Sequence, residues 1–140
     1  MRIRKFRKGD EKKIKKLIGG ILLEIFKKEP KGLEDLDNIK KNYKIFWVVE
    51  DKGKIIATAG INRDNIAKRL YIYKKYRKKG LGKKLYYLQE SYLKKKGIRK
   101  IKLSTTPQMK DAIKFYEKKG FKKIKIDKKK NQIFFEKILK

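Results

Sequence analysis

The sequence predicts a mixed α/β protein built on a largely antiparallel sheet. Two observations lead to this prediction. Segments with apolar residues at helical spacing alternate with short segments rich in β-branched and aromatic residues. A DKGK turn joins two of the latter closely enough for a β-hairpin, whose strands are antiparallel. The expected order is β-α-α-β-β-β-α-β-α-β-β, and 140 residues suffice for a single domain, 1–140, with its own core.

The chain is expected to open with a strand at residues 2–7 and then a helix. The helix is predicted because apolar residues recur at helical spacing at Ile14, Leu17, Ile18, Ile21, Leu22 and Ile25. Pro30 lies beyond its end. A second, shorter helix is expected at residues 33–43, with an apolar face formed by Leu36, Ile39 and Tyr43.

The central part of the chain is expected to be mostly strand. The hairpin strands are predicted at residues 45–50 and 55–61, and a third strand at residues 69–73. A helix follows Gly82 and ends near Gly97.

The last part is expected to add a strand at residues 99–105 and a helix at residues 109–119. Gly120 follows this helix, where a residue in the left-handed conformation commonly ends a helix. Two closing strands are predicted at residues 122–126 and 132–138.

The charge is strongly basic. The chain has 45 Lys and Arg residues against 15 Asp and Glu, a formal net charge of +30. One interpretation is an electrostatic surface for nucleic acid or another polyanion. The other is a compositional preference for lysine, with charges spread over every solvated face. Lysine exceeds arginine and is scattered, whereas specific nucleic-acid contacts rely on arginine's bidentate fork, so the compositional interpretation is favoured.

Two residue types are missing. Without cysteine there is no disulfide, thiol nucleophile or thiolate metal site, and without histidine there is no Ser-His-Asp triad and no usual metal ligand. No metal site is therefore expected. The most apolar early run, 18–26, is too short to span a membrane and contains Glu24. A soluble, cytoplasmic protein without a membrane partner is the expectation.

The stretch YRKKGLGKKL, residues 76–85, suggests a phosphate-binding turn. It fails as a P-loop because Arg77 and Lys84 occupy the required Gly and Ser/Thr positions, and as a dinucleotide fingerprint because Leu85 replaces the third glycine. Gly80 and Gly82 can still adopt backbone angles closed to other residues, and amides at a helix N-terminus bind anions. The alternative is a plain strand-to-helix turn in which the glycines only relieve strain.

Two motifs resemble those of the GCN5-related N-acetyltransferases. Arg77, Gly80 and Gly82 match R-x-x-G-x-G between a strand and a helix, which is similar to the family's motif A, Q/R-x-x-G-x-G/A. The family's second signature, A-x-x-[FL]-Y-x-x-x-G-F, is matched by Ala112, Phe115, Tyr116, Gly120 and Phe121. One helix and one strand separate the two motifs, as in the family. The resemblance extends over essentially the whole chain.

The resemblance implies a GNAT-type fold, in which helices flank the sheet and two central parallel strands, 69–73 and 99–105, splay apart around acetyl-CoA, the acetyl donor. On the first strand it places Leu70, Tyr71 and Ile72 at the cofactor, with backbone groups of Leu70 and Ile72 paired to the pantetheine arm. In the turn the implied cofactor-binding residues are Arg77, Lys78, Lys79, Gly80, Leu81, Gly82 and Lys83. The amides from Lys78 to Lys83 would hold the pyrophosphate.

The implied activity is acetyl transfer to a primary amine of a small molecule or peptide by direct attack on the thioester. The resemblance assigns the oxyanion-binding amide to Ile72 and the acid that protonates the leaving thiolate to Tyr116, which also contacts the cofactor. In the alternative interpretation, Tyr116 packs against the cofactor without proton transfer. The general base is not assigned: Glu50 and Asp64 are the nearest acids in sequence, and water would serve equally well.

The chain departs from the family pattern at Lys74, a frequent proline, and at Met109, often an asparagine. Acidic residues near the expected second helix, which borders the acceptor site in many family members, are Glu29, Glu34, Asp35 and Asp37. A homodimer is a further expectation, since exposed closing strands of this fold often pair. The competing hypothesis is a basic nucleic-acid-binding module that keeps the fold without the chemistry.

Overall fold

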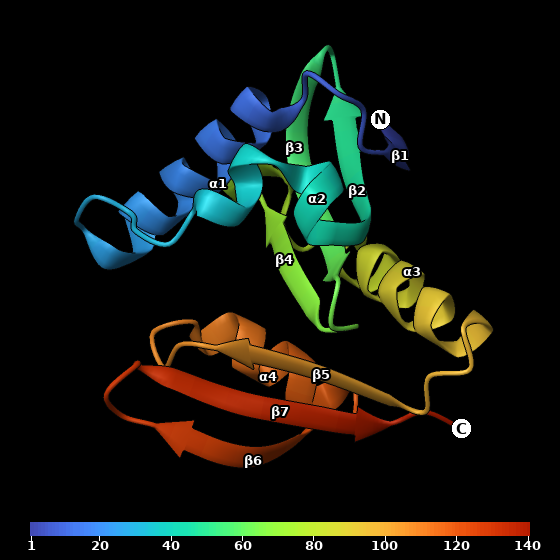
Figure 1. Cartoon of the computed structure of the whole chain (residues 1–140). Coiled ribbons are helices and arrows are strands. Elements are labelled where there is room, and N and C mark those ends of the chain that lie inside the picture. Colours follow the sequence, from blue (N-terminus) through green and yellow to red (C-terminus); the bar gives the residue numbers. More distant parts are fainter. The chain divides into compact units, whose positions relative to one another are not determined.

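The computed structural model describes residues 1–140 and divides into two compact units, Met1–Gln89 and Glu90–Lys140 (Figure 1). The boundary falls within one helix, α3 (Leu81–Lys95). Each unit has its own antiparallel sheet. The predicted mixed α/β fold class is confirmed. The single-domain boundary and the splayed pair, whose strands lie in different units, stay predictions.

The first unit contains a four-stranded sheet in the order β1-β2-β3-β4. Its elements are β1 (Arg2–Lys5), α1 (Glu11–Phe26), the 3-10 helix η1 (Glu34–Asp37), α2 (Ile39–Asn42), β2 (Tyr43–Asp51), β3 (Lys54–Asn62), β4 (Ala67–Ile72) and the 3-10 helix η2 (Lys74–Tyr76). The strand β3 is buried at seven consecutive positions, Ile55 to Ile61. Alternating burial would leave one face in water, so this pattern indicates that both faces are covered.

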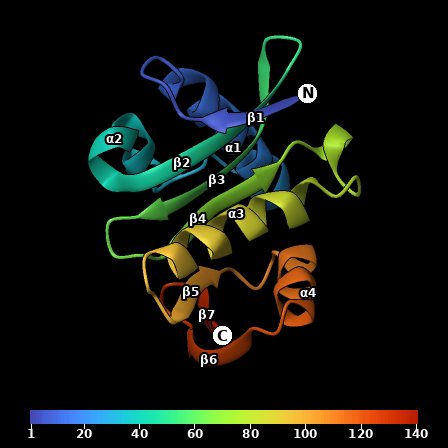
Figure 2. The same ribbon diagram turned by 90° about the vertical axis from the view of Figure 1, so that its right-hand side faces the viewer.

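Helices supply that cover. Figure 2 shows α1 on one side of the sheet and α3 on the other. On α1, Ile14 and Ile18 are fully buried, and at the start of α3 so are Leu85 and Tyr86. The Gln89 side-chain amide donates to the Gly60 carbonyl at 3.0 Å, which fixes α3 to the middle of β3. The direction in which α3 starts is therefore set by the core of the first unit.

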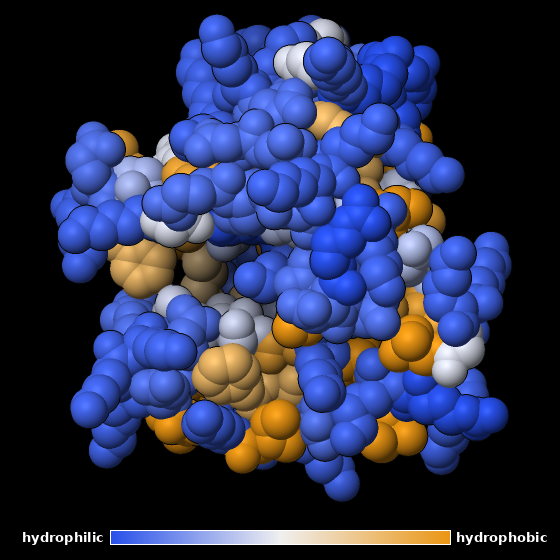
Figure 3. All heavy atoms as spheres, viewed as in Figure 1, coloured by the Kyte–Doolittle hydropathy of each residue, from blue (hydrophilic) through white to orange (hydrophobic).

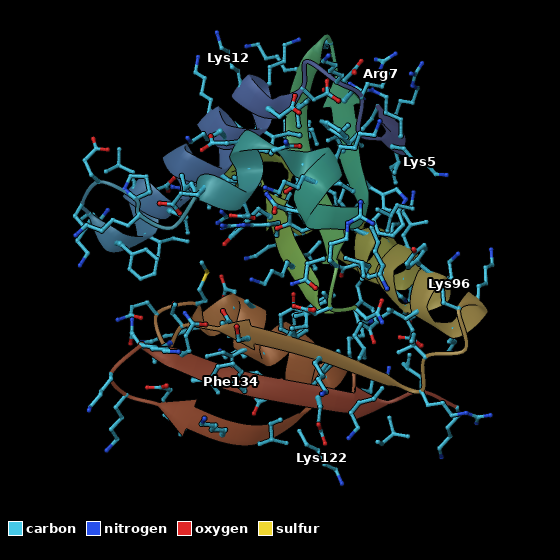
Figure 4. The ribbon with its side chains drawn as sticks, viewed as in Figure 1. Lys5, Arg7, Lys12, Lys96, Lys122 and Phe134 are labelled. Carbon is cyan, nitrogen blue, oxygen red and sulfur yellow. The ribbon has the colours of Figure 1, made fainter.

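The second unit contains a three-stranded sheet in the order β5-β7-β6. Its elements besides the end of α3 are β5 (Lys100–Thr105), α4 (Lys110–Lys118), β6 (Lys122–Asp127) and β7 (Gln132–Ile138). Ile133 and Phe135 of β7 are buried, while Phe134 between them lies on the opposite face beneath Lys125, whose Nζ is 5.8 Å from the ring centre (Figure 4). This sheet thus has the burial alternation of a half-covered sheet.

The predicted second helix is wrong in extent. Residues 33–43 form η1, the single turn α2 and, at Tyr43, the first residue of β2. The interruption is at Asn38, which has a φ of −144° and whose side chain accepts a hydrogen bond from the Lys41 amide at 3.1 Å. Asparagine competes with helical hydrogen bonds in this way, so an apolar face alone does not maintain a helix here.

Basic side chains are distributed over elements of both units. Lys5, Arg7, Lys12, Lys96 and Lys122 are exposed and point away from the ribbon (Figure 4). Figure 3 shows hydrophilic residues over most of the visible face, with apolar residues in scattered patches. This distribution agrees with the compositional interpretation of the charge. None of the helices is both long and apolar enough to cross a membrane.

Candidate functional site

The outer edge of β4 offers backbone hydrogen-bonding groups. β4 is the last strand of its sheet, so this edge has no partner strand within that sheet. The Tyr73 amide donates to the Ile56 carbonyl of β3 at 2.8 Å, and Ile72 pairs with Ala57. In an antiparallel ladder neighbouring residues face opposite edges, so Ile72 directs its backbone groups outward. By the same alternation Leu70 shares that edge.

A bulge precedes this edge. From the pair Thr58–Tyr71 to the pair Gly60–Lys68, β3 advances by two residues and β4 by three. Arg69 takes up the extra residue with a φ of +60°, which is uncommon for a residue other than glycine. Its carbonyl accepts a hydrogen bond from the buried Thr58 hydroxyl at 2.7 Å. The bulge thus turns the backbone just before the predicted cofactor residues.

The Arg69 side chain forms a charged cluster that the sequence did not predict. It bonds the Asp35 carboxylate twice, and its Nη2 donates to the Gly32 carbonyl at 2.8 Å. The Tyr43 hydroxyl also donates to Asp35. Arg69 lies more than 30 positions from both Asp35 and Gly32, and the acidic residues around position 35 were the only signal in the sequence.

Asp35 and Tyr43 in this cluster each keep one protonation state at neutral pH. Burial raises the pKa of Asp35, but hydrogen bonds from Arg69 and Tyr43 outweigh burial and hold that pKa below its ordinary value. Burial, aided by the hydrogen bond to Asp35, raises the pKa of Tyr43. At neutral pH Asp35 is therefore ionised and Tyr43 neutral. Neither is suited to accept a proton from an amine.

The turn after β4 forms an anion-binding shape. Lys78 and Gly80 have φ values of +62° and +84°, and a Cβ on Gly80 would meet nothing within 4 Å. Its conformation, and not crowding, therefore calls for glycine there. Gly82, in contrast, lies within α3 and has no positive φ, so it does not use the backbone freedom that glycine offers.

The first turn of α3 completes this shape. The Lys84 amide already donates to the Gly80 carbonyl at 3.2 Å. The amides of residues 81–83 come before Lys84, the first amide with an acceptor in the helix, so they lack a partner within the helix. No acidic residue lies in this turn. Positive partial charge at the helix start and free space in front of Gly80 suit a phosphate group.

Tyr116 lies on α4 in the second unit. Its ring is 5.4 Å from both the Phe115 and Phe121 rings, in edge-on geometry, and its carbonyl accepts from the Phe121 amide at 3.0 Å. Gly120 has a φ of +95°, which explains the glycine of the second motif. The predicted residues from Leu70 to Lys83 thus come together in one unit, and Tyr116 belongs to the other.

The two acids nearest in sequence differ in their surroundings. Glu50 bonds Arg4 through Nε at 2.7 Å and lies 3.6 Å from Arg7, and the hydrogen bond from Arg4 lowers the pKa of Glu50. Asp64 is exposed and borders a cavity of about 240 Å³ that Lys68 also lines. Glu50 is therefore part of an ion-pair network at β1 and β2, whereas Asp64 faces an open cavity.

Comparison with known proteins identifies the family. Residues 42–123 match the model described as acetyltransferase (GNAT) domain, which is more than half of the chain, and the chain belongs to the GNAT acetyltransferase family. The uncharacterized N-acetyltransferase YjgM of Escherichia coli strain K12 is 33% identical over 86 residues, covering 56% of this chain and 52% of YjgM. The chain spans about half the length of the curated relatives it matches.

Solved structures show the same fold. An acetyltransferase of the GNAT family from Staphylococcus aureus Mu50 is 26% identical, with a TM-score of 0.87 over 99% of both chains. A protein of Bacillus anthracis str. Ames, crystallised with acetyl coenzyme A, is 26% identical, with a TM-score of 0.62 over 74% of this chain and 66% of its own.

Proposed function

We propose that this chain transfers an acetyl group from acetyl-CoA to a primary amine of a small molecule or peptide, by direct attack of the amine on the thioester. The observation that carries the proposal is the continuity of the outer edge of β4, the left-handed turn at Lys78 and Gly80, and the start of α3. This segment offers first outward-facing strand groups and then helix-start amides, which suit a pantetheine arm and a pyrophosphate. The acetyl-CoA bound to the Bacillus anthracis relative supports the same donor.

We assign binding or catalytic roles to the predicted site residues. The amides of residues 81–83, with Lys78 and Lys79, hold the pyrophosphate. When bound, acetyl-CoA supplies the activated acetyl thioester. Both backbone groups of Ile72 face outward, and its carbonyl already accepts a hydrogen bond from Arg77 Nε at 2.9 Å. The Ile72 amide is therefore the group that would donate to the thioester oxygen. The Tyr116 hydroxyl donates a proton to the departing thiolate, since phenols and thiols have similar pKa values.

The acceptor amine must lose a proton before it attacks. Asp35 and Glu50 are held by arginines, so we assign the proton to solvent water. Asp64 borders the same cavity as Asp35 and is the exposed carboxylate there. The formal net charge of +30 disfavours strongly cationic acceptors through repulsion. The expected acceptors are therefore amines whose other groups are neutral or anionic.

A cofactor titration tests the proposal. The protein should bind CoA tightly at moderate salt, and any RNA binding should be weak and fall steeply with salt. Absence of CoA binding would refute the enzyme hypothesis. The competing nucleic-acid module has no support among the relatives, and the scattered lysines do not favour it. A screen of amines, amino acids and peptides, followed by release of the CoA thiol, would then identify the acceptor.

The remaining expectations concern assembly and location. Ile124 and Ile126 are each 53% exposed on β6, the edge strand of the second sheet, where a second copy could pair in a homodimer. Light scattering over a range of protein concentrations tests this expectation. A cytoplasmic location also stays a prediction.

A further inference from the structure

A hydrogen bond joins the candidate phosphate turn to a distant strand end. The Tyr76 hydroxyl donates to Oδ2 of Asp51 at 2.6 Å. Tyr76 ends η2, immediately before the turn, and Asp51 is the last residue of β2. Since β3 lies between β2 and β4 in the sheet, and Asp51 pairs with Lys54, this bond spans β3 at its N-terminal end. It ties the segment after β4 to a part of the sheet that β4 does not touch.

The turn needs support of this kind. Residues 74–84 contain seven basic residues and no acidic one, so their charges repel one another. Lys78, with its φ of +62°, adopts a conformation that costs energy in a residue with a side chain. Such a conformation persists only where its surroundings enforce it. Without a bound anion, the enforcement must come from the protein itself.

The Tyr76 ring lies close to two residues of the same segment, Tyr73 and Lys79. The Tyr76 amide donates to the Tyr73 carbonyl at 2.8 Å, and the two rings lie 6.4 Å apart. Lys79 places its Nζ 5.9 Å from the centre of the Tyr76 ring. At the far end, the N-terminal ammonium of Met1 lies 3.8 Å from Oδ1 of Asp51. Asp51 is thus a carboxylate to which the basic turn is connected through a neutral phenol.

We propose that Tyr76, together with Asp51, is a positioning residue that holds the turn in its anion-binding shape before the cofactor arrives. Tyr76 acts through the backbone of residues 77–83 and does not touch the reacting atoms. This inference rests on the proposed function, because it assumes that the turn receives the pyrophosphate of CoA. It predicts that loss of the hydrogen bond weakens binding of the phosphate part of the cofactor and leaves the pantetheine part unaffected.

Calorimetric titration with CoA and with pantetheine, which lacks the phosphates, tests this. Tyr76→Phe and Asp51→Ala should each raise the dissociation constant for CoA by roughly tenfold, as expected for a hydrogen bond to a charged group. The dissociation constant for pantetheine should not change. The double variant should bind CoA about as weakly as either single variant, because both remove the same bond. Tyr73→Phe, which keeps the ring and loses a neighbouring hydroxyl, is the control and should bind like the unaltered protein.

Hydrogen exchange gives a readout in the free protein. The amides of Arg77 and Lys84, which donate to the Lys74 and Gly80 carbonyls, should exchange faster in Tyr76→Phe than in Tyr73→Phe when no CoA is present. Unchanged CoA affinity in Tyr76→Phe would overturn the inference, as would an equal loss of CoA and pantetheine affinity, which indicates a general loss of structure. If the unaltered protein fails to bind CoA, the proposed function itself is wrong.

Discussion

The guanidinium of Arg69 bonds the carboxylate of Asp35 at two points, from Nε to Oδ2 at 3.0 Å and from Nη2 to Oδ1 at 2.6 Å. The two-point geometry fixes both side chains in one orientation. Arg69 is also the residue with the left-handed backbone in the bulge of β4. The ion pair therefore joins the segment after α1 to the bend that precedes the candidate cofactor edge, and it helps to maintain the backbone strain there.

Asp35→Ala should lower the free energy of unfolding by about 2–4 kcal/mol, because it leaves a largely buried guanidinium without its carboxylate. Asp37→Ala is the matched control. Asp37 belongs to the same 3-10 helix and bonds Lys15 at 2.7 Å, but its side chain is 56% exposed, against 26% for Asp35. An exposed pair contributes at most about 1 kcal/mol. Urea unfolding measures both variants, and equal losses would contradict the distinction.

The position of the turn after β4 could be predicted from the sequence, whereas the ion pair of Arg69 and Asp35 could not. Helical and strand periodicity located the elements, and Arg77, Gly80 and Gly82 marked the turn, because these depend on local spacing. The Arg69–Asp35 pair depends on how a loop packs on a strand more than 30 positions away, which spacing does not encode. The left-handed Lys78 was also not predictable, because lysine carries no signal for that conformation.

The same pair should make stability depend on pH. The pKa of Asp35 is lowered in the folded state, so between the folded and unfolded pKa values the unfolded chain binds more protons and stability rises with pH. The contribution is complete above the ordinary Asp pKa of about 3.9 and is lost as the pH falls toward the folded pKa.

The thermal unfolding midpoint measures this effect. Asp35→Asn, which cannot titrate, should be less stable than the unaltered protein at pH 7, and the two midpoints should converge as the pH falls below about 4. If the midpoints of the two proteins instead differ by a constant amount over this pH range, Asp35 has the same pKa in the folded and the unfolded state, and the prediction is wrong.

Gly80→Ala should affect both stability and cofactor binding. A side chain at a φ of +84° costs about 1–2 kcal/mol, and relief of this strain distorts the turn. Gly53→Ala is a matched control, since Gly53 has a φ of +78° and likewise nothing within 4 Å of an added Cβ, but lies between β2 and β3. The two variants should lose similar stability in urea, and only Gly80→Ala should bind CoA more weakly. Equal CoA affinity would remove the turn from the binding site.

Tyr116→Phe separates proton donation from packing. The variant keeps the ring that lies edge-on to Phe121, so folding and CoA affinity should be nearly unchanged. Loss of the hydroxyl removes the proposed general acid, and kcat should fall by about a hundredfold once an acceptor is known. Tyr92→Phe near the end of α3 removes a hydroxyl outside the proposed machinery and should turn over normally. Unaltered turnover in Tyr116→Phe would leave the ring a packing role alone, and water would then protonate the thiolate.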